Sequence, residues 1–125
     1  MIAGIGTDIV AVARMAEYFE RHGERGLEKM LAPAEREACR TSPEPARFLA
    51  KRFAAKEALG KALGTGIRAP VLLPEIAVEH DALGKPIFGF SAALADHLAG
   101  RGLTTHLSIS DERDYAVAFV VLEKA

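Results

Sequence analysis

The most informative stretch of the chain is Arg52-Phe53-Ala54-Ala55-Lys56-Glu57-Ala58-Leu59-Gly60-Lys61-Ala62-Leu63-Gly64-Thr65-Gly66, because it predicts a helix that carries charges within an apolar face. At about 100° per residue, an arc of roughly 140° on the helical wheel holds the apolar side chains Phe48, Leu49, Phe53, Leu59 and Leu63. Arg52 and Lys56 fall inside the same arc. The pattern indicates a packed helix that is built around something anionic.

Ordinary explanations compete with this interpretation of the helix. Arg52 and Lys56 can lay their methylene groups on apolar surface while their charged heads stay in water. Glu57 and Lys61, one turn apart beside small alanines, can form a common surface ion pair at i,i+4. A second polar residue in an apolar setting is needed to favour a functional site.

Asp8 supplies that second feature, because it stands at the end of an apolar strand that begins with Met1-Ile2-Ala3-Gly4-Ile5-Gly6. A buried carboxylate needs a partner or a metal ion. One acid from a strand end and one from a helix, here Asp8 and Glu57, suit Mg²⁺, which takes one or two carboxylates together with waters and phosphate oxygens. The alternative is that Asp8 caps the N-terminus of the following helix.

Several motifs together resemble those of one enzyme family. They are Gly4-Ile5-Gly6-Thr7-Asp8-Ile9, Arg52-Phe53-Ala54-Ala55-Lys56-Glu57-Ala58 with Lys61 and Gly64-Thr65-Gly66, Gly84-Lys85-Pro86, and His106-Leu107-Ser108-Ile109-Ser110. In order and spacing, from Gly4 to about Glu123, the chain resembles the holo-acyl-carrier-protein synthases, the short branch of the 4′-phosphopantetheinyl transferases. The resemblance implies an α+β fold in which a small antiparallel sheet wraps around a long central helix. It also implies one domain over residues 1–125 and a cyclic homotrimer with active sites between subunits.

The implied reaction moves the phosphopantetheine arm of coenzyme A to a serine of apo-acyl carrier protein and releases adenosine 3′,5′-bisphosphate, in fatty acid biosynthesis. The resemblance gives the catalytic roles to Asp8, Glu57 and Lys61, with Mg²⁺ held by Asp8 and Glu57. Lys61 would neutralise charge that develops on the phosphates. The general base stays open among Glu57, a metal-bound water and Asp111.

The resemblance also implies a set of contacts to coenzyme A. The candidate residues are Arg52, Lys56, Gly64, Thr65, Gly84, Lys85, Pro86, His106 and Ser108. Lys56 could equally pair with an acid of the fold, and the alternating polar residues of 104–110 could be a solvated sheet face. Leu83 stands where family members often carry Asn, so a side-chain hydrogen bond from that position is lost.

A carrier protein with an acidic helix would need a cationic surface, for which Arg14, Arg21 and Arg25 are the candidates. Their spacing aligns them on one face only if a helix continues through Gly23 and Gly26. Acidic residues beside them make the segment neutral overall, so a solvent face laced with salt bridges is the alternative.

The composition narrows the class of protein. The chain has 125 residues and a net charge of −1, which argues against a general nucleic-acid binder. The single Cys39 cannot form an internal disulfide, and nothing near it is spaced like a zinc site. We see no secretory leader and no membrane-spanning run, so we expect a cytoplasmic protein that does not enter a membrane.

The expected elements follow from periodicity and from Gly and Pro positions. They are a strand at 2–9, helical segments at 12–22 and 24–31, a short helix from 33 to 39, a long helix at 45–63, strands at 75–80 and 86–90, a helix at 91–100, and strands at 104–110 and 115–122. The last strand is apolar on both faces, so both must be covered. A helix can cover one face, and a partner subunit is expected on the other.

Two other functions fit parts of the sequence. A non-catalytic trimer that binds coenzyme A or a nucleotide would keep Arg52, Lys56 and the glycine turns, but it would have no use for Asp8 and Glu57. A purely structural trimer would leave the charges of the apolar arc without a purpose. The paired acids therefore favour the enzyme.

Overall fold

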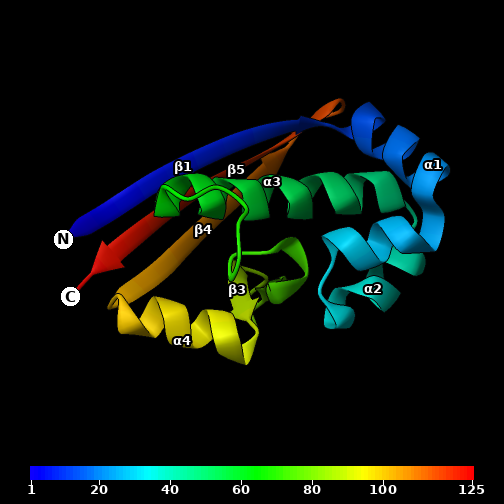
Figure 1. Cartoon of the computed structure of the whole chain (residues 1–125). Coiled ribbons are helices and arrows are strands. Elements are labelled where there is room, and N and C mark those ends of the chain that lie inside the picture. The colour runs from blue at the N-terminus through cyan, green and yellow to red at the C-terminus, as the bar shows by residue number, and fades with distance from the viewer.

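The computed structural model describes all 125 residues and confirms the α+β architecture (Figure 1). Along the chain lie β1 (Ile2–Ala11), α1 (Val12–Met30), α2 (Pro33–Arg40), α3 (Pro45–Leu63), the 3₁₀ helix η1 (Leu73–Glu75), β2 (Ile76–His80), β3 (Pro86–Phe90), α4 (Ala92–Gly100), β4 (Leu103–Asp111) and β5 (Tyr115–Lys124). The expected boundaries hold to within about two residues. One difference is that residues 73–75 form a 3₁₀ turn before β2 begins.

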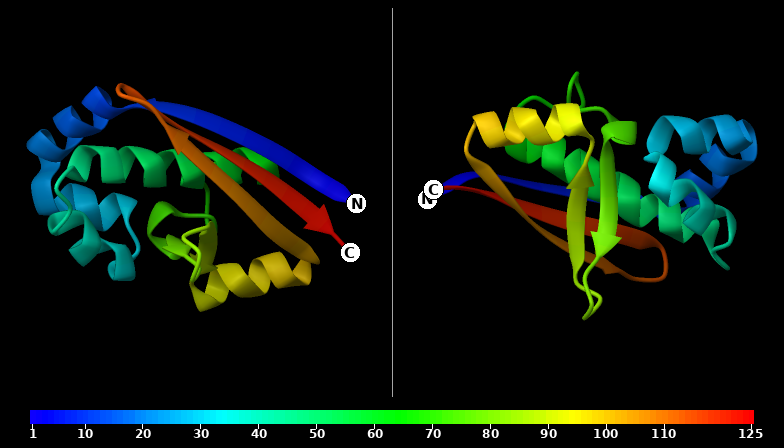
Figure 2. Two further views of the ribbon diagram at one scale, coloured as in Figure 1. Left: turned by 180° about the vertical axis from the view of Figure 1, so that it is seen from behind. Right: turned by 90° about the horizontal axis from the view of Figure 1, so that it is seen from below.

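Two antiparallel sheets share the central helix. The larger one has the strand order β1-β5-β4, and the smaller one is the β2–β3 hairpin. Helix α3 runs along the three-stranded sheet, while α1 and α2 gather at one end of the molecule (Figure 1). The hairpin projects past the large sheet on the same side of the molecule as α4 (Figure 2).

Helix α3 begins and ends where its sequence predicts. Pro45 occupies the first turn, in which its missing N–H costs nothing, and Gly64 ends the helix with a φ of 79°. Its alanines at 50, 54, 55 and 58 are fully buried, so neighbouring segments approach its backbone closely.

The two glycines of β1 explain how closely this strand and α3 can pack. A Cβ atom at Gly6 would lie 2.1 Å from the carbonyl oxygen of Ala58, and one at Gly4 would lie 2.2 Å from that of Ala62. No side chain fits in this space, so glycine is required at both positions. This contact sets the distance between β1 and the second half of α3, the two segments that carry Asp8 and Lys61.

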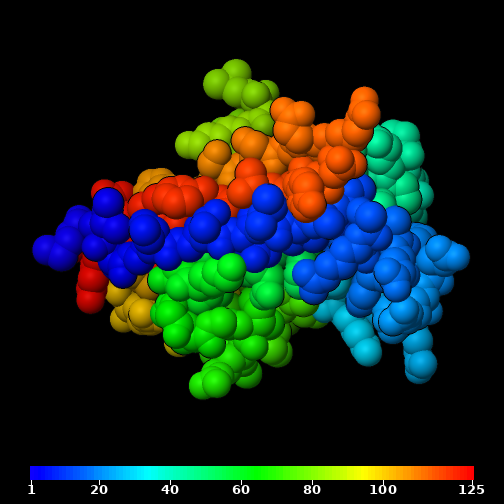
Figure 3. All heavy atoms as spheres, turned by 90° about the horizontal axis from the view of Figure 1, so that it is seen from above, coloured from blue at the N-terminus to red at the C-terminus, as the bar shows by residue number.

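The two faces of β5, both of which are apolar, differ in burial within the single chain. Ala116, Ala118, Val120 and Leu122 are buried beneath α3. On the opposite face Phe119 is 44% exposed and Val117 is 37% exposed, and Ile5 and Ile9 of β1 are also exposed there. The helix therefore covers one face, and the other is an apolar surface in the single chain. Viewed along the sheet edge, β1 runs between β5 and the end of α3 and leads into α1 (Figure 3).

Candidate active site

Asp8 and Lys61 meet where β1 crosses α3. Lys61 Nζ donates to Asp8 Oδ1 at 3.0 Å and to the carbonyl of Thr7 at 3.0 Å. The Asp8 side chain is 18% exposed, and that of Lys61 is 56% exposed, so the pair opens to solvent from the lysine side. The N-cap residue of α1 is Ala11, and no side chain caps the helix there. Asp8 therefore does not cap this helix.

Glu57 lies one turn before Lys61 on the same helix and belongs to the same cluster. Burial raises the pKa of Glu57 above its ordinary value, and the charge of Asp8 raises it further, against the opposing charges of Lys61 and Arg14. The Glu57 carboxylate has no hydrogen-bond partner within the chain. The two carboxylates are therefore close enough for the charge of one to act on the other, and Lys61 is hydrogen-bonded only to Asp8.

This donor set fits a divalent cation of the magnesium type. Mg²⁺ prefers oxygen ligands and is commonly held by one or two carboxylates, with the other positions filled by water and phosphate. No group of three or more His, Cys, Asp or Glu side chains is placed to hold a metal, which argues against a closed site made of protein ligands alone. An ion here would supply charge neutralisation for phosphate oxygens.

Arg14 lies next to this cluster, at the start of α1. Its guanidinium carbon is 5.3 Å from the centre of the Phe53 ring, and its charge acts on Glu57. Sequence reasoning placed Arg14 at the carrier-protein surface, and the structure also brings it to the edge of the acidic site.

A cationic groove continues from Arg14 along α1. A hollow of about 280 Å³ is lined by residues that include Arg14 and Arg21, and it adjoins a larger one of about 510 Å³ lined by Arg21, His22, Arg25, Gly26, Glu28 and Lys29. The helix bends at Gly23, whose φ is 54°, and the hydroxyl of Tyr18 donates to the carbonyl of Gly26 across the bend at 3.1 Å. Arg21 pairs with Glu17 at 2.9 Å, as the alternative interpretation expected.

Lys56 is enclosed within the fold, which contradicts its assignment to coenzyme A. Its side chain is fully buried, and Nζ donates to Glu35 Oε1 at 2.6 Å and to the carbonyls of Met30 and Leu73 at 2.7 and 3.1 Å. The alternative, that Lys56 pairs with an acid of the fold, is correct. The anion within the apolar arc is an internal carboxylate.

Arg52 meets the same carboxylate. Its Nε lies 3.0 Å from Glu35 Oε2, and its guanidinium stacks over the Phe48 ring at 3.8 Å. The side chain is 12% exposed and borders a small hollow of about 150 Å³ that Arg47 and Lys51 also line. Only its outer edge is available to a phosphate.

The glycine-containing loops are ordered and exposed. In the β2–β3 turn, Asp81 Oδ1 accepts the backbone N–H groups of Leu83 and Lys85 at 2.9 Å each, and Gly84 has a φ of 85°. These bonds lower the pKa of Asp81. Gly64, Thr65, Gly84 and Lys85 are all exposed, whereas Pro86 is half-buried at the start of β3. This turn joins the two strands that the sequence predicts at 75–80 and 86–90, and an Asp at the start of a turn is a common signal.

His106 and Ser108 lie on the other side of the sheet from the acidic cluster. In the register of the sheet, His106 is opposite Val121 and Ser108 is opposite Phe119, so both side chains share the outer face with the exposed apolar residues. His106 Nε2 is 2.9 Å from Glu123 Oε1. A single chain therefore does not bring this polar row to Asp8 and Glu57.

Asp111, the third candidate for the general base, is engaged elsewhere. It forms ion pairs with Arg47 at 3.1 Å and Lys51 at 3.8 Å.

Glu35 is the residue that sequence reasoning missed, because an acid in a short polar helix is usually on the surface. The signal that could have found it is its position three residues after Ala32 in the first turn, where its carboxylate accepts the Ala32 N–H at 2.9 Å.

Comparison with known proteins shows the family of this chain. Residues 4–120 match the family model of the 4′-phosphopantetheinyl transferase superfamily. A holo-[acyl-carrier-protein] synthase from Azoarcus sp. (strain BH72) is 60% identical over 123 residues, which cover 98% of each chain. The crystal structure of a holo-[acyl-carrier-protein] synthase from Neisseria meningitidis superposes with a TM-score of 0.95 at 46% identity, covering 99% of this chain and 100% of that one.

A third relative has been crystallised with ligand. The holo-(acyl-carrier-protein) synthase from Bacillus anthracis, in complex with CoA (3′,5′-ADP), superposes with a TM-score of 0.83 at 38% identity, covering 100% of this chain and 99% of that one. The fold is thus that of a known family of enzymes. The chain belongs to the holo-[acyl-carrier-protein] synthases of the 4′-phosphopantetheinyl transferase superfamily.

Proposed function

We propose that this chain transfers the 4′-phosphopantetheine group of coenzyme A to a serine of an apo-acyl carrier protein in a Mg²⁺-dependent reaction. The observation that carries the proposal is the cluster of Asp8, Glu57 and Lys61 on a chain of this family. Adenosine 3′,5′-bisphosphate is the second product. The holo-carrier protein would serve fatty acid biosynthesis in the cytoplasm. No helix of the chain is long and apolar enough to cross a membrane.

The two acids and Lys61 would have different electrostatic roles. Asp8 and Glu57 would hold the ion, which supplies charge neutralisation to the pyrophosphate when it is bound. Lys61 orients the Asp8 carboxylate through their ion pair, and its exposed ammonium can move to the phosphate on which charge develops. Glu57, with its raised pKa and no partner in the chain, is the side chain best placed to accept the proton of the serine if it is not occupied by the ion.

The rest of the coenzyme A site is supplied by exposed groups. Gly64, Thr65, Gly84, Lys85 and Pro86 would contact the nucleotide through loops whose backbone N–H groups can reach phosphate oxygens. Arg52 would contribute its outer edge, with the neighbouring Arg47 and Lys51 around the same hollow. His106 and Ser108 complete the set from the opposite face of the sheet.

A homotrimer with shared sites would unite these two faces. Ile5, Ile9, Val117 and Phe119 form an exposed apolar surface on the outer side of β1 and β5. Covering this surface with another copy would bury the apolar residues and carry His106 and Ser108 of one copy toward the Asp8 and Glu57 of the next. The separation of the two groups in one chain supports this arrangement.

The groove along α1 is proposed as the docking surface for the carrier protein. Arg14, Arg21 and Arg25 lie along two adjoining hollows, and Arg14 also reaches the acidic cluster. An acidic helix seated there would have its serine brought toward Glu57. Such charge complementarity mainly contributes to association rate and specificity.

The direct test is mass spectrometry of apo-carrier protein after incubation with this chain, coenzyme A and Mg²⁺. We expect the serine to gain the phosphopantetheine mass, EDTA to stop the reaction reversibly, and Asp8→Ala to slow it by orders of magnitude while the fold survives. Full activity in Asp8→Ala would contradict the metal assignment. Binding of coenzyme A without transfer would support the alternative of a non-catalytic binding module.

A further inference from the structure

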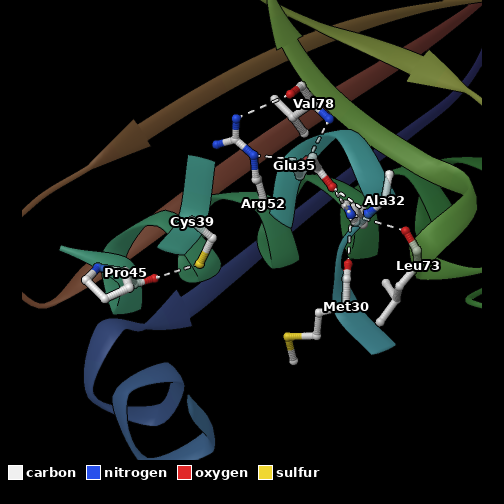
Figure 4. Close-up of polar contacts among 9 residues, drawn as sticks. Met30, Ala32, Glu35, Cys39, Pro45, Arg52, Leu73 and Val78 are labelled. Carbon is white, nitrogen blue, oxygen red and sulfur yellow. Dashed lines mark hydrogen bonds and ion pairs between the residues drawn. The ribbon is translucent and has the colours of Figure 1, made fainter. Parts of the chain in front are cut away.

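A buried charge cluster in the interior does not belong to the catalytic site. Its centre is Glu35 of α2, whose side chain is 3% exposed. One carboxylate oxygen accepts from Lys56 Nζ and from the N–H of Ala32, at 2.6 and 2.9 Å. The other accepts the N–H of Val78 at 2.9 Å and lies 3.0 Å from Arg52 Nε (Figure 4). Three hydrogen bonds and one further ion-pair contact therefore converge on this carboxylate.

The cluster closes the free edge of the hairpin. Val78 of β2 is paired with Phe88 of β3, and its remaining backbone groups face α2 and α3. Glu35 accepts the N–H of Val78, and Arg52 Nη2 donates to the carbonyl of Val78 at 3.3 Å. Two side chains of opposite charge thus satisfy the strand edge where a neighbouring strand would otherwise pair.

Lys56 attaches the base of the same hairpin at a second point. Its ammonium donates to the carbonyl of Leu73, in η1 just before β2, at 3.1 Å. Its other two donors go to Glu35 and to the carbonyl of Met30, so all three N–H groups are satisfied. Two attachments, at Leu73 and at Val78, fix the direction of the hairpin relative to α3.

This geometry places the cluster between two parts of the proposed site. Helix α3 carries Glu57, the residue after Lys56, whereas the hairpin ends in the Gly84-Lys85-Pro86 turn. Buried ion pairs are weak devices for stability, since well-packed apolar side chains often do as well. What they add is a fixed geometry, because each partner must satisfy specific atoms.

We propose that Glu35 is a positioning residue, which attaches the β2–β3 hairpin to α3 and thereby holds the Gly84-Lys85-Pro86 turn in place for coenzyme A. The role toward coenzyme A rests on the proposed function. The attachment itself rests only on the contacts of Glu35, Arg52 and Lys56.

The test compares Glu35→Gln, and the double variant Glu35→Gln with Lys56→Met, with wild type. The double variant removes both charges and so avoids an uncompensated buried ammonium that could unfold the chain. Leu122→Val, a change in the buried face of β5, is the control for general loss of stability. Amide hydrogen exchange and steady-state kinetics are measured on all four proteins.

In both Glu35 variants we expect amides of residues 76–80 and 87–90 to exchange at least about tenfold faster, while those in the middle of α3 keep the protection seen in the Leu122→Val control. The KM for coenzyme A should rise about tenfold with a smaller change in kcat, which a merely structural role would not produce.

Two results would overturn the proposal. One is loss of protection that is uniform across the hairpin, α3 and β5, with KM for coenzyme A as in the control. The other is a double variant whose hairpin is as protected as in wild type. If wild type did not transfer phosphopantetheine at all, the proposed function would fail, whereas the exchange measurement would still decide whether Glu35 attaches the hairpin.

Discussion

At the scale of single residues, the charged side chains of α3 have two different roles. Lys56 and Arg52 point inward to Glu35, and burial lowers the pKa of Lys56 to about 8 despite that partner. Glu57 and Lys61, one position and one turn further along, point to Asp8 and to solvent. Neighbouring residues of one helix therefore serve the interior and the site separately.

Glu57 should lower the stability of the metal-free chain at neutral pH. Burial and the charge of Asp8 raise its folded-state pKa above 4.5. Below about pH 4.5 the carboxyl is protonated in both the folded and unfolded states and costs nothing. As the pH rises through the folded-state pKa, ionisation costs the folded state more than the unfolded one, so the penalty is complete at neutral pH.

Urea unfolding in the presence of EDTA measures this effect of Glu57 on the free energy of unfolding. We expect Glu57→Gln to increase the free energy of unfolding at pH 7 and to lose this advantage below pH 4.5, while it abolishes turnover. Glu17→Gln, a change at an exposed acid, is the control and should show no such gain. A Glu57→Gln chain that is less stable than wild type at pH 7 would contradict the account of this cluster.

At the scale of elements, the site depends on how closely β1 approaches α3. Asp8 and Lys61 belong to different elements, and Gly4 and Gly6 allow the two backbones to touch. The residues of the motif Gly4-Ile5-Gly6-Thr7-Asp8 therefore act together. Its glycines allow the strand to pack closely on the helix, and this close packing lets Asp8 reach Lys61.

Gly6→Ala should separate the two elements. The added Cβ would lie 2.1 Å from the Ala58 carbonyl oxygen, a backbone atom that cannot move aside on its own. We expect a loss of about 1–3 kcal/mol in the free energy of unfolding and a fall in kcat, because Asp8 moves relative to Glu57. Gly100→Ala is the matched control, since a Cβ there meets nothing within 4 Å. Equal stability of the two variants in urea titrations would contradict this role of Gly6.

The bent helix α1 should govern the affinity for the carrier protein. Arg21→Glu combined with Arg25→Glu is expected to raise the KM for carrier protein while the KM for coenzyme A stays the same. Each exposed pair contributes only about 0.2–1 kcal/mol, so single alanine changes should be mild. Arg14 is left unchanged because its charge also acts on Glu57.

The control reverses the charges of Arg101 and Lys124, which are exposed on other elements. Raising the salt concentration should weaken wild type and narrow its difference from the α1 variant. An equal rise in carrier-protein KM for both charge-reversal variants would mean that net charge, and not this groove, governs docking.

At the scale of the whole molecule, the sequence predicted the architecture well and the site unevenly. Helix α3 was predicted from Pro45 to Leu63 because Pro and Gly mark its ends. A helix was also predicted from residue 91, where Ser91 caps α4 by accepting the N–H of Leu94. The closeness of Asp8 and Lys61 was predicted only through the family motif. Periodicity could not reveal that Lys56 meets Glu35, since 21 residues and a chain reversal separate them.

The residues of the proposed site lie on two opposite faces of the large sheet. Asp8, Glu57 and Lys61 lie on the helix side of the large sheet, whereas His106 and Ser108 lie on its outer face beside the exposed Val117 and Phe119. If transfer requires both groups, one chain alone is incomplete. Two copies must meet through the apolar face, and each active site must draw residues from both.

Complementation between two inactive variants tests this claim most directly. Asp8→Ala is unfolded and refolded together with the double variant His106→Ala and Ser108→Ala, and formation of holo-carrier protein is followed by mass spectrometry. Random mixing in equal amounts would leave about a quarter of shared sites with both wild-type halves, so we expect about a quarter of the wild-type rate. Each variant refolded alone should stay inactive. A mixture no more active than its separate components would contradict a phosphopantetheine-transfer site that is shared between copies.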